Sequence, residues 1–326
     1  MTDQNFTNMP YRQLGQSGLK VSALSLGTGR KTFGFDIDTK KACELIAYAF
    51  DHGVNFFDTA EYYAAGKAEH MVGTALKQYP RDAYIVATKL FQGCRMSLDT
   101  SLKPNQTGLS RKHLYDGLNQ SLKRLQLDYV DLLYCHFDDP TVPMVEIVTT
   151  MNHFIQQGKI LYWGTSNWRT ERLLEAYDCA NRLGLEGPTM AQPEYNLLHR
   201  HCVEIEYQRV FVQHTMGTVI YSPLAGGLLT GKYNYGIPNN SRLHTRPQWI
   251  PEDLELQLKQ ITQLETICKD FNVDMTQLAI AWCLQNKAVS SVILGASNLS
   301  QLKHNLGAIN IHIADDFKHQ IEKIFK

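Results

Sequence analysis

The chain has 326 residues, 44% of them hydrophobic, which is enough for a large core and leaves open one large domain or two smaller ones. Lysine plus arginine and aspartate plus glutamate both number 32, so the formal net charge is zero. This balance does not favour a nucleic acid or an anionic membrane as partner, although a local basic patch for a phosphorylated cofactor stays open.

The cysteine pattern indicates reduced thiols. Seven cysteines occur, an odd number, and none form a CxxC pair, so neither a disulfide framework nor a metal site is expected. The first residues are polar and lack the apolar stretch of a signal peptide. Since no apolar run reaches the ~20 residues of a membrane-spanning helix, we predict a cytoplasmic protein without direct membrane insertion.

The first half of the chain alternates short apolar runs with segments of helical period. Strands are expected over 21–26, 54–57, 83–87 and 129–135, and helices over 40–52, 67–78 and 110–125. Gly53 is a typical helix stop, and Ser110 is a plausible N-cap for the third helix.

The second half repeats this alternation. Strands are expected over 160–164, 188–191, 219–221 and 291–294, and helices over 144–157, 170–183, 203–216, 254–271, 275–286, 299–306 and 314–326. About eight strand–helix units predict an α/β fold with a parallel sheet and right-handed crossovers. In this length they favour a (β/α)8 TIM barrel, one domain over residues 1–326, with extended loops 91–109 and 225–251 at its C-terminal face and a C-terminal helix.

Polar side chains recur where the predicted strands end, and a barrel gathers those ends around one rim. They are Asp58, Lys89, His136, Ser166, Asn167, Gln192, Tyr221 and Ser297. Each residue alone has an ordinary explanation as a cap, a half-buried aromatic or a rim histidine. Together they are what a catalytic barrel requires.

Three of these residues, Asp58, Lys89 and His136, suit carbonyl reduction together with Tyr63. A free tyrosine phenol, with a pKa near ~10, is a weak acid. We expect an ammonium at Lys89 to lower the pKa of Tyr63, five residues after Asp58, and so to ease proton donation. Asp58 would hold the ammonium in place, and His136 would hydrogen-bond the carbonyl oxygen or relay a proton.

The segments DTAEYYAAGKAE, VATK, GLSRKHLYDGL, LDYVDLLYCH, WGTSNW, SPLAGGLLTGKY and VILGASNLSQLKHN resemble the aldo-keto reductase superfamily over residues 12–311. Within it, TVPMVEIVTTMNHFIQQGKILYWGTSNW and AIAWCLQNKAVSSVILGASN are most similar to voltage-gated potassium channel β-subunits and their bacterial reductase relatives. The resemblance implies Asp58, Tyr63, Lys89 and His136 as the catalytic set, with Tyr63 as general acid.

The resemblance also implies NADPH, or NADP+ in the reverse direction, bound extended across the barrel mouth without a GxGxxG motif. Ser166, Asn167 and Gln192 would hold the carboxamide, Tyr221 would stack on the nicotinamide, and Thr28 would lie near the cofactor. The remaining cofactor contacts, to the pyrophosphate, the 2′-phosphate and the adenine, would come from Ser222, Pro223, Leu224, Gly226, Lys232, Arg242, Gly295, Ser297, Gln301 and Asn305.

Two functions from different classes follow. The first is an enzyme that reduces a small carbonyl substrate with NADPH. The alternative is a cofactor-sensing regulatory protein with slow catalysis, docked on a channel-like partner. The channel subunits typically carry Asn where His136 stands, and His is typical of active reductases, which favours the enzyme. The resemblance adds a homotetramer as a hypothesis.

The substrate pocket is the least determined part. Gly29 replaces a Trp common in the β-subunits, which opens the pocket, and His304 replaces a Glu that often contacts adenine. Aromatic residues near the rim either line an apolar pocket or are scattered surface aromatics. They are Phe33, Tyr62, Phe91, Phe137 and Trp168.

Overall fold

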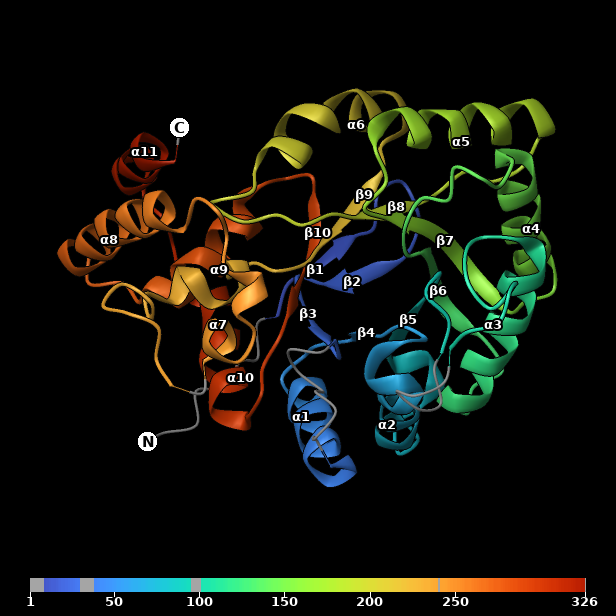
Figure 1. Ribbon diagram of the computed structural model, residues 1–326, viewed down its shortest axis with the longest axis horizontal. Coiled ribbons are helices and arrows are strands. Elements are labelled where there is room, and N and C mark those ends of the chain that lie inside the picture. Colours follow the sequence, from blue (N-terminus) through green and yellow to red (C-terminus); the bar gives the residue numbers. More distant parts are fainter. Residues whose placement is uncertain (1–8, 30–37, 95–100, 240, 326) are drawn as a thin grey trace.

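Parallel strands close on themselves at the centre of the molecule. The computed structural model describes residues 9–29, 38–94, 101–239 and 241–325, and its barrel has the strand order β10-β3-β4-β5-β6-β7-β8-β9. Helices surround this barrel (Figure 1). The predicted (β/α)8 barrel is therefore confirmed.

The barrel strands run in the predicted order and pair in parallel. They are β3 (Leu24–Gly27), β4 (Phe56–Asp58), β5 (Ile85–Leu90), β6 (Val130–Cys135), β7 (Ile160–Ser166), β8 (Met190–Gln192), β9 (Gly217–Ile220) and β10 (Val289–Leu294). Asp58 lies opposite Ala87 on β5, and Lys89 lies opposite Tyr134 on β6. This register brings the carboxyl ends of neighbouring strands to one rim.

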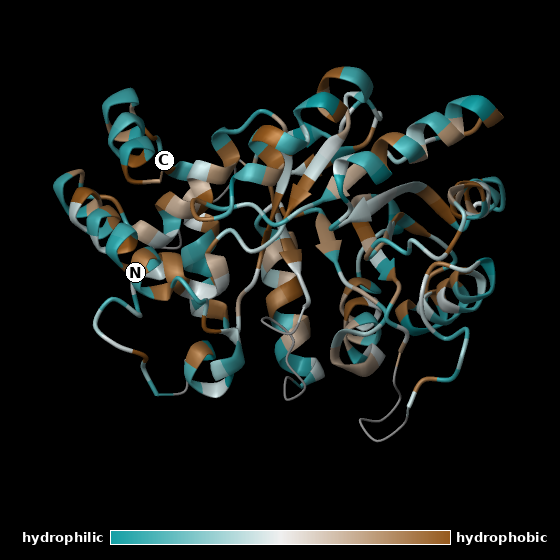
Figure 2. Cartoon of the chain, turned by 45° about the horizontal axis from the view of Figure 1, so that its top comes forward, coloured by the Kyte–Doolittle hydropathy of each residue, from teal (hydrophilic) through white to brown (hydrophobic). Residues whose placement is uncertain are grey.

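The helices bury one face against the barrel or against another helix, as amphipathic helices do. They are α1 (Thr39–Asp51), α2 (Lys67–Leu76), α3 (Arg111–Leu125), α4 (Met144–Gln156), α5 (Thr170–Leu183), α6 (Gln208–His214), α7 (Arg242–Thr245), α8 (Leu254–Asp270), α9 (Met275–Gln285), α10 (Leu299–Leu306) and α11 (Asp315–Ile324). Hydrophilic and hydrophobic residues alternate around them (Figure 2). In the parts of the chain that the structure describes, no helix combines the length and apolarity needed to cross a bilayer.

Side chains at the helix ends explain several boundaries. Ser110 caps α3 as predicted, since its hydroxyl accepts a hydrogen bond from the His113 N–H at 3.3 Å. Asn298 caps α10 in the same way by accepting the Gln301 N–H at 2.9 Å. The helix α5 ends at Gly184, whose φ of 65° lies in the left-handed region that glycine tolerates.

The prediction of one strand over 21–26 is wrong, because two strands lie there. β1 (Tyr11–Gln13) and β2 (Lys20–Ser22) form an antiparallel hairpin, and the barrel strand β3 begins only after Ala23. Leu14 and Val21 of the hairpin are buried among inward-facing barrel residues near the strand starts. The hairpin therefore closes the barrel at the end opposite the rim formed by the carboxyl ends of the strands. The sequence hides the break because Ala23 continues the apolar pattern.

Two other segments differ from their predicted form. The helix predicted over 203–216 begins as a π-helical turn, Cys202–Glu206, and continues as α6. The loop 225–251 contains the helical turns Ala225–Thr230 and Pro247–Trp249 on either side of α7. Phe33, predicted near the rim, lies outside the described residues.

Candidate active site

The alternation of side chains along the strands builds the site. The inward-facing residues Phe56, Ala87, Tyr134, Met190 and Val219 belong to one cluster inside the barrel. Side chains two residues apart on a strand share a face. The residues two positions further along these strands are Asp58, Lys89, His136, Gln192 and Tyr221. They therefore form a layer of mostly polar side chains at the carboxyl ends of the strands, next to the hydrophobic residues that fill the barrel.

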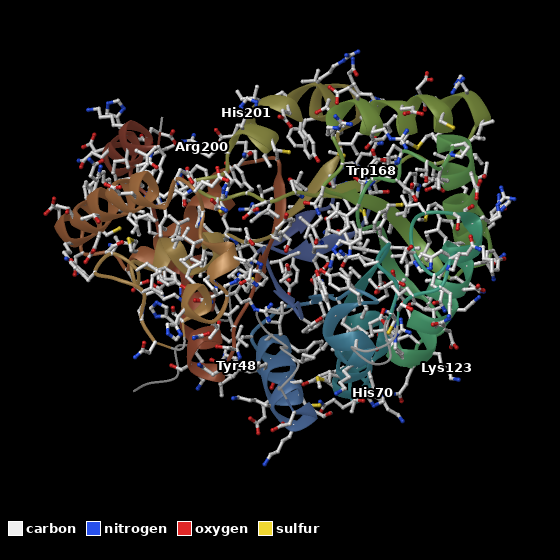
Figure 3. All side chains as sticks on the ribbon, in the orientation of Figure 1. Tyr48, His70, Lys123, Trp168, Arg200 and His201 are labelled. Atoms are coloured by element: carbon white, nitrogen blue, oxygen red, sulfur yellow. The ribbon has the colours of Figure 1, made fainter. Side chains whose placement is uncertain are left out.

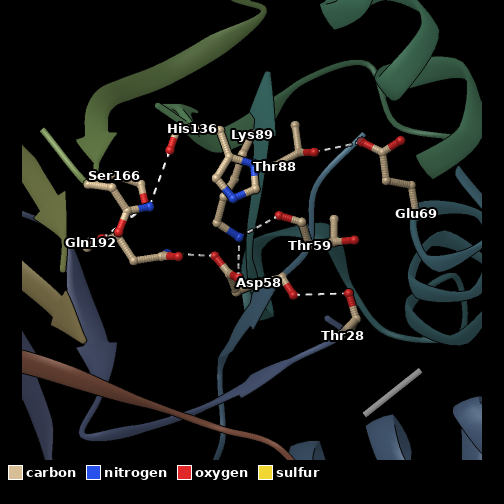
Figure 4. Close-up of polar contacts among 10 residues, drawn as sticks. Thr28, Asp58, Thr59, Glu69, Thr88, Lys89, His136, Ser166 and Gln192 are labelled. Atoms are coloured by element: carbon tan, nitrogen blue, oxygen red, sulfur yellow. Dashed lines mark hydrogen bonds and ion pairs between the residues drawn. The ribbon is translucent and has the colours of Figure 1, made fainter. Parts of the chain in front are cut away.

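A buried ion pair lies at the centre of this layer. Lys89 is 0% exposed and Asp58 is 3% exposed, and the Lys89 ammonium donates a hydrogen bond to Oδ1 of Asp58. The ammonium also donates to the Thr59 carbonyl at 2.7 Å, and Nε2 of Gln192 donates to Oδ2 of Asp58 at 2.9 Å (Figure 4). Burial lowers the pKa of Lys89, and the Asp58 carboxylate opposes this effect. Such a pair is stable only when its remaining polar atoms are satisfied, as they are here.

Tyr63 begins the turn that follows β4, and its ring lies over this pair. The Lys89 Nζ is 5.0 Å from the centre of the half-buried ring. The prediction that the ammonium lowers the pKa of Tyr63 is wrong for this structure. Burial, followed by the negative charge of Asp58, raises the pKa of Tyr63 well above its ordinary value. The phenol is therefore protonated at neutral pH, which is the form that a proton donor needs.

His136 lies beside this phenol. The ring centres of Tyr63 and His136 are 5.9 Å apart. Burial, followed by the charge of Lys89, lowers the pKa of His136 well below its ordinary value, so the imidazole is neutral. The structure thus brings all four predicted catalytic side chains together, from three strand ends and one adjoining turn.

The side chains predicted to hold the nicotinamide form a connected set next to the tetrad. The Tyr221 hydroxyl donates to Oδ1 of Asn167 at 2.8 Å, and Nδ2 of Asn167 donates to the Ser166 hydroxyl at 3.0 Å. Ser166 in turn donates to the Gln192 carbonyl at 2.9 Å. Thr28 is buried on the other side, with its hydroxyl donating to the Asp58 carbonyl at 3.1 Å.

The residues predicted around the phosphates meet at one tight turn after β9. Its backbone has positive φ at Ser222 and at three positions that follow it, Ala225, Gly226 and Gly227. A Cβ at Gly227 would lie 2.8 Å from Nζ of Lys232, and one at Gly226 would lie 3.6 Å from Nη1 of Arg242. Two cations therefore lie directly against a glycine turn. Pro223 and Leu224 occupy the same turn.

The predicted adenine-side residues gather at the start of α10. The Ser297 hydroxyl and its N–H both lie within 3.0 Å of Oε1 of Gln301. Nδ2 of Asn305 donates to the Gly295 carbonyl at 3.3 Å. His304, which replaces a Glu that often contacts adenine in the family it resembles, has its Nε2 2.9 Å from the Asp274 carboxylate.

Residues 23–326 match the sequence profile of the Aldo/keto reductase family. The chain belongs to this family. It is 44% identical over 312 residues to a probable voltage-gated potassium channel subunit beta of Arabidopsis thaliana, covering 93% of this chain and 92% of that protein. It is 45% identical over 312 residues, with the same shares, to a probable voltage-gated potassium channel subunit beta of Oryza sativa subsp. japonica.

Sequence reasoning on this aldo/keto reductase missed two contributions. The first is a pair of arginines on one tryptophan, since the guanidinium groups of Arg246 and Arg242 lie 4.6 Å and 4.2 Å from the ring centre of Trp249. The RLHTRPQW sequence, with two arginines four apart before a tryptophan, was the available signal. The second is the hydrogen bond from Gln192 to Asp58. The sequence predicts Gln192 only as a contact of the cofactor.

A cavity of about 730 Å³ opens beside the residues predicted to hold the nicotinamide. Asn167 and Tyr221 form part of its wall, together with Trp168, Arg200 and His201, which are labelled in Figure 3. No member of the predicted catalytic tetrad lines this cavity, so it lies beside the tetrad without including it. Within the described ranges, no three histidine, cysteine or carboxylate side chains are grouped for a metal ion.

The neutral state of His136 predicts a pH dependence of stability. An unfolded histidine takes up a proton near pH ~6.5, whereas folded His136 does so only at lower pH. The unfolded state then binds more protons, so stability falls as pH drops below about 6.5, by up to ~1.4 kcal/mol per pH unit for one group.

Urea unfolding between about pH 7.5 and 5 should show a smaller loss of unfolding free energy in His136→Asn than in wild type. The exposed His70→Asn is the matched control. Equal pH slopes in His136→Asn and wild type would contradict the assignment.

Proposed function

We propose that this aldo/keto reductase reduces small aldehydes and ketones to alcohols with NADPH, and that Tyr63 donates the proton. The observation that carries the proposal is the arrangement at the rim, where a protonated phenol lies 5.0 Å above a buried ammonium and beside a neutral imidazole. A developing alkoxide needs such a proton donor close by.

The residues of the chain fit NADPH. Nη1 of Arg242 is buried and has no hydrogen-bond partner among the described residues. Burial and the neighbouring Arg246 lower the pKa of Arg242 to about 10, which an anion would offset. The Gly226–Gly227 turn beside Lys232 offers backbone and cation to a pyrophosphate. Arg242 and Arg246 would suit the additional 2′-phosphate that distinguishes NADPH from NADH.

When bound, NADPH supplies the hydride that adds to the carbonyl carbon. Tyr63 gives its hydroxyl proton to the carbonyl oxygen as that oxygen becomes an alkoxide. Loss of this proton leaves a phenolate, and the ammonium of Lys89 stabilises it from 5.0 Å below the ring. Asp58 fixes that ammonium, and Gln192 fixes Asp58. Solvent returns the proton to Tyr63.

The rim favours apolar and aromatic carbonyl compounds. Tyr62, Phe91 and Phe137 are half-buried next to the tetrad, with Phe91 and Phe137 in edge contact at 5.5 Å. Aromatic rings gain from stacking and from burial of their faces. These three rings form an apolar surface next to His136, and the aromatic ring of a substrate would pack against that surface.

The channel-associated alternative is not favoured. Its support lies in the names of the two plant relatives, and those names describe the relatives. The contacts among Asp58, Tyr63, Lys89 and His136 in this chain favour a catalytic function over a purely regulatory one. A homotetramer and a cytoplasmic location stay predictions.

The test of the reaction is Tyr63→Phe. This change removes the donated proton and keeps the ring, so turnover of an aromatic aldehyde such as 4-nitrobenzaldehyde should fall by ~10²-fold or more. NADPH oxidation is followed by absorbance, and NADPH affinity is measured separately and should not change. The exposed Tyr235→Phe is the matched control. A Tyr63→Phe enzyme as fast as wild type would exclude Tyr63 as the donor.

The test of the cofactor is Arg242→Ala. Loss of the buried guanidinium should weaken NADPH binding roughly tenfold or more, because hydrogen bonds to charged groups contribute about 1.5–3 kcal/mol. NADH lacks the 2′-phosphate, so its affinity should change less. The comparison uses quenching of protein fluorescence, with the exposed Arg182→Ala as control. An equal loss for both cofactors would place Arg242 away from the 2′-phosphate.

A further inference from the structure

His136 is oriented by aromatic rings. Its Nδ1 is buried and has no hydrogen-bond partner in the part of the chain that the structure describes. The ring of Phe137 stacks on the imidazole, with centres 4.9 Å apart and planes 11° apart. Tyr62 and Tyr63 approach the imidazole at 5.3 Å and 5.9 Å, tilted or edge-on. Functional histidines commonly have one ring nitrogen fixed by a hydrogen bond, whereas Nδ1 of His136 has none among the described residues and its ring is stacked on Phe137.

The stacking ring is itself held from behind. Phe91 meets Phe137 edge to face at 5.5 Å with planes at 65°. The backbone N–H groups of Phe91 and Gly93 both donate to Oε1 of Glu61, at 2.7 Å and 2.8 Å. This carboxylate is 1% exposed.

Glu61 also links the two sides of the reaction centre. It lies two residues before Tyr63 on the same turn, and its own N–H donates to the Lys89 carbonyl at 3.2 Å. The turn that carries the proton donor is thereby tied to the loop that carries Phe91. The contacts run from Glu61 through Phe91 and Phe137 to His136.

We infer that Phe137 is a positioning residue that holds the His136 imidazole toward Tyr63 and the carbonyl oxygen, with Phe91 locked behind it by Glu61. The inference rests on the proposed reductase activity. A neutral imidazole has one donor and one acceptor nitrogen, so rotation of the ring exchanges what it presents to the substrate. Stacking limits this rotation without adding a charge or a competing hydrogen bond.

The variants Phe137→Leu and Phe137→Tyr distinguish an effect of the stacked ring from an effect of any apolar side chain at this position. Leucine keeps an apolar side chain and removes the stack, whereas tyrosine keeps the ring. With butanal, which has no aromatic ring to lose contact with Phe137, kcat should fall about 3- to 10-fold in Phe137→Leu. It should stay within about twofold of wild type in Phe137→Tyr. NADPH affinity should be unchanged in both variants, and the effect of Phe137→Leu should be larger on kcat than on the KM for butanal.

A second readout does not depend on turnover. The imidazole Cε1–H signals of the protein are recorded by nuclear magnetic resonance, and the His136 signal is assigned by its loss in His136→Asn. Phe137→Leu should move this signal, because the ring current of Phe137 is lost, and should broaden it as the imidazole gains rotational freedom. Phe137→Tyr should leave it in place.

The two readouts separate the possible failures. If wild type reduces no aldehyde, the proposed reductase activity fails, and the His136 signal alone decides the inference. An unmoved signal in Phe137→Leu overturns the inference. So does an equal fall of kcat in Phe137→Leu and Phe137→Tyr, or a fall that appears in KM alone.

Discussion

The buried ion pair between Lys89 and Asp58 is the interaction on which the rest of the site depends. A charge inside a barrel loses its hydration, and a single buried ammonium would be strongly unfavourable. Here the ammonium reaches Asp58 and the Thr59 carbonyl, and Gln192 satisfies the other carboxylate oxygen. Two acceptors, the Asp58 carboxylate and the Thr59 carbonyl, thus hold one positive charge below the Tyr63 ring, and Gln192 from across the barrel holds the carboxylate.

The barrel explains why these groups meet. The residues Phe56, Ala87 and Met190 fill the interior, and the polar side chain two positions later on each strand emerges above them. The hairpin of β1 and β2 seals the opposite end. The mouth then divides into two sides, with cations and a glycine turn at Lys232 and Arg242 and aromatic rings around His136. The polyanionic cofactor and the apolar carbonyl compound are proposed for these two different sides.

Much of this arrangement could be predicted from the sequence. Strand-end polarity and strand–helix alternation placed Asp58, Lys89, His136 and Gln192 on one rim, because the period of two in a strand is a local property. The direction of the Tyr63 pKa could not be predicted, since it depends on how completely Asp58 engages Lys89 and on the depth of burial. The stack of Phe137 on His136 is set by side-chain rotation. The break at Ala23 arises because β2 pairs with β1 in a hairpin, whereas β3 pairs with the distant strand β10. Neither leaves a periodic signal.

The most direct measurement is single-turnover reduction of an aromatic aldehyde by a Lys89→Met variant with bound NADPH. Methionine keeps the length and volume of the stem and removes the charge. If the ammonium stabilises the phenolate of Tyr63, the rate should fall by ~10²- to 10⁴-fold while NADPH remains bound. A rate within a few-fold of wild type would contradict the account, because proton donation would then not need the buried charge.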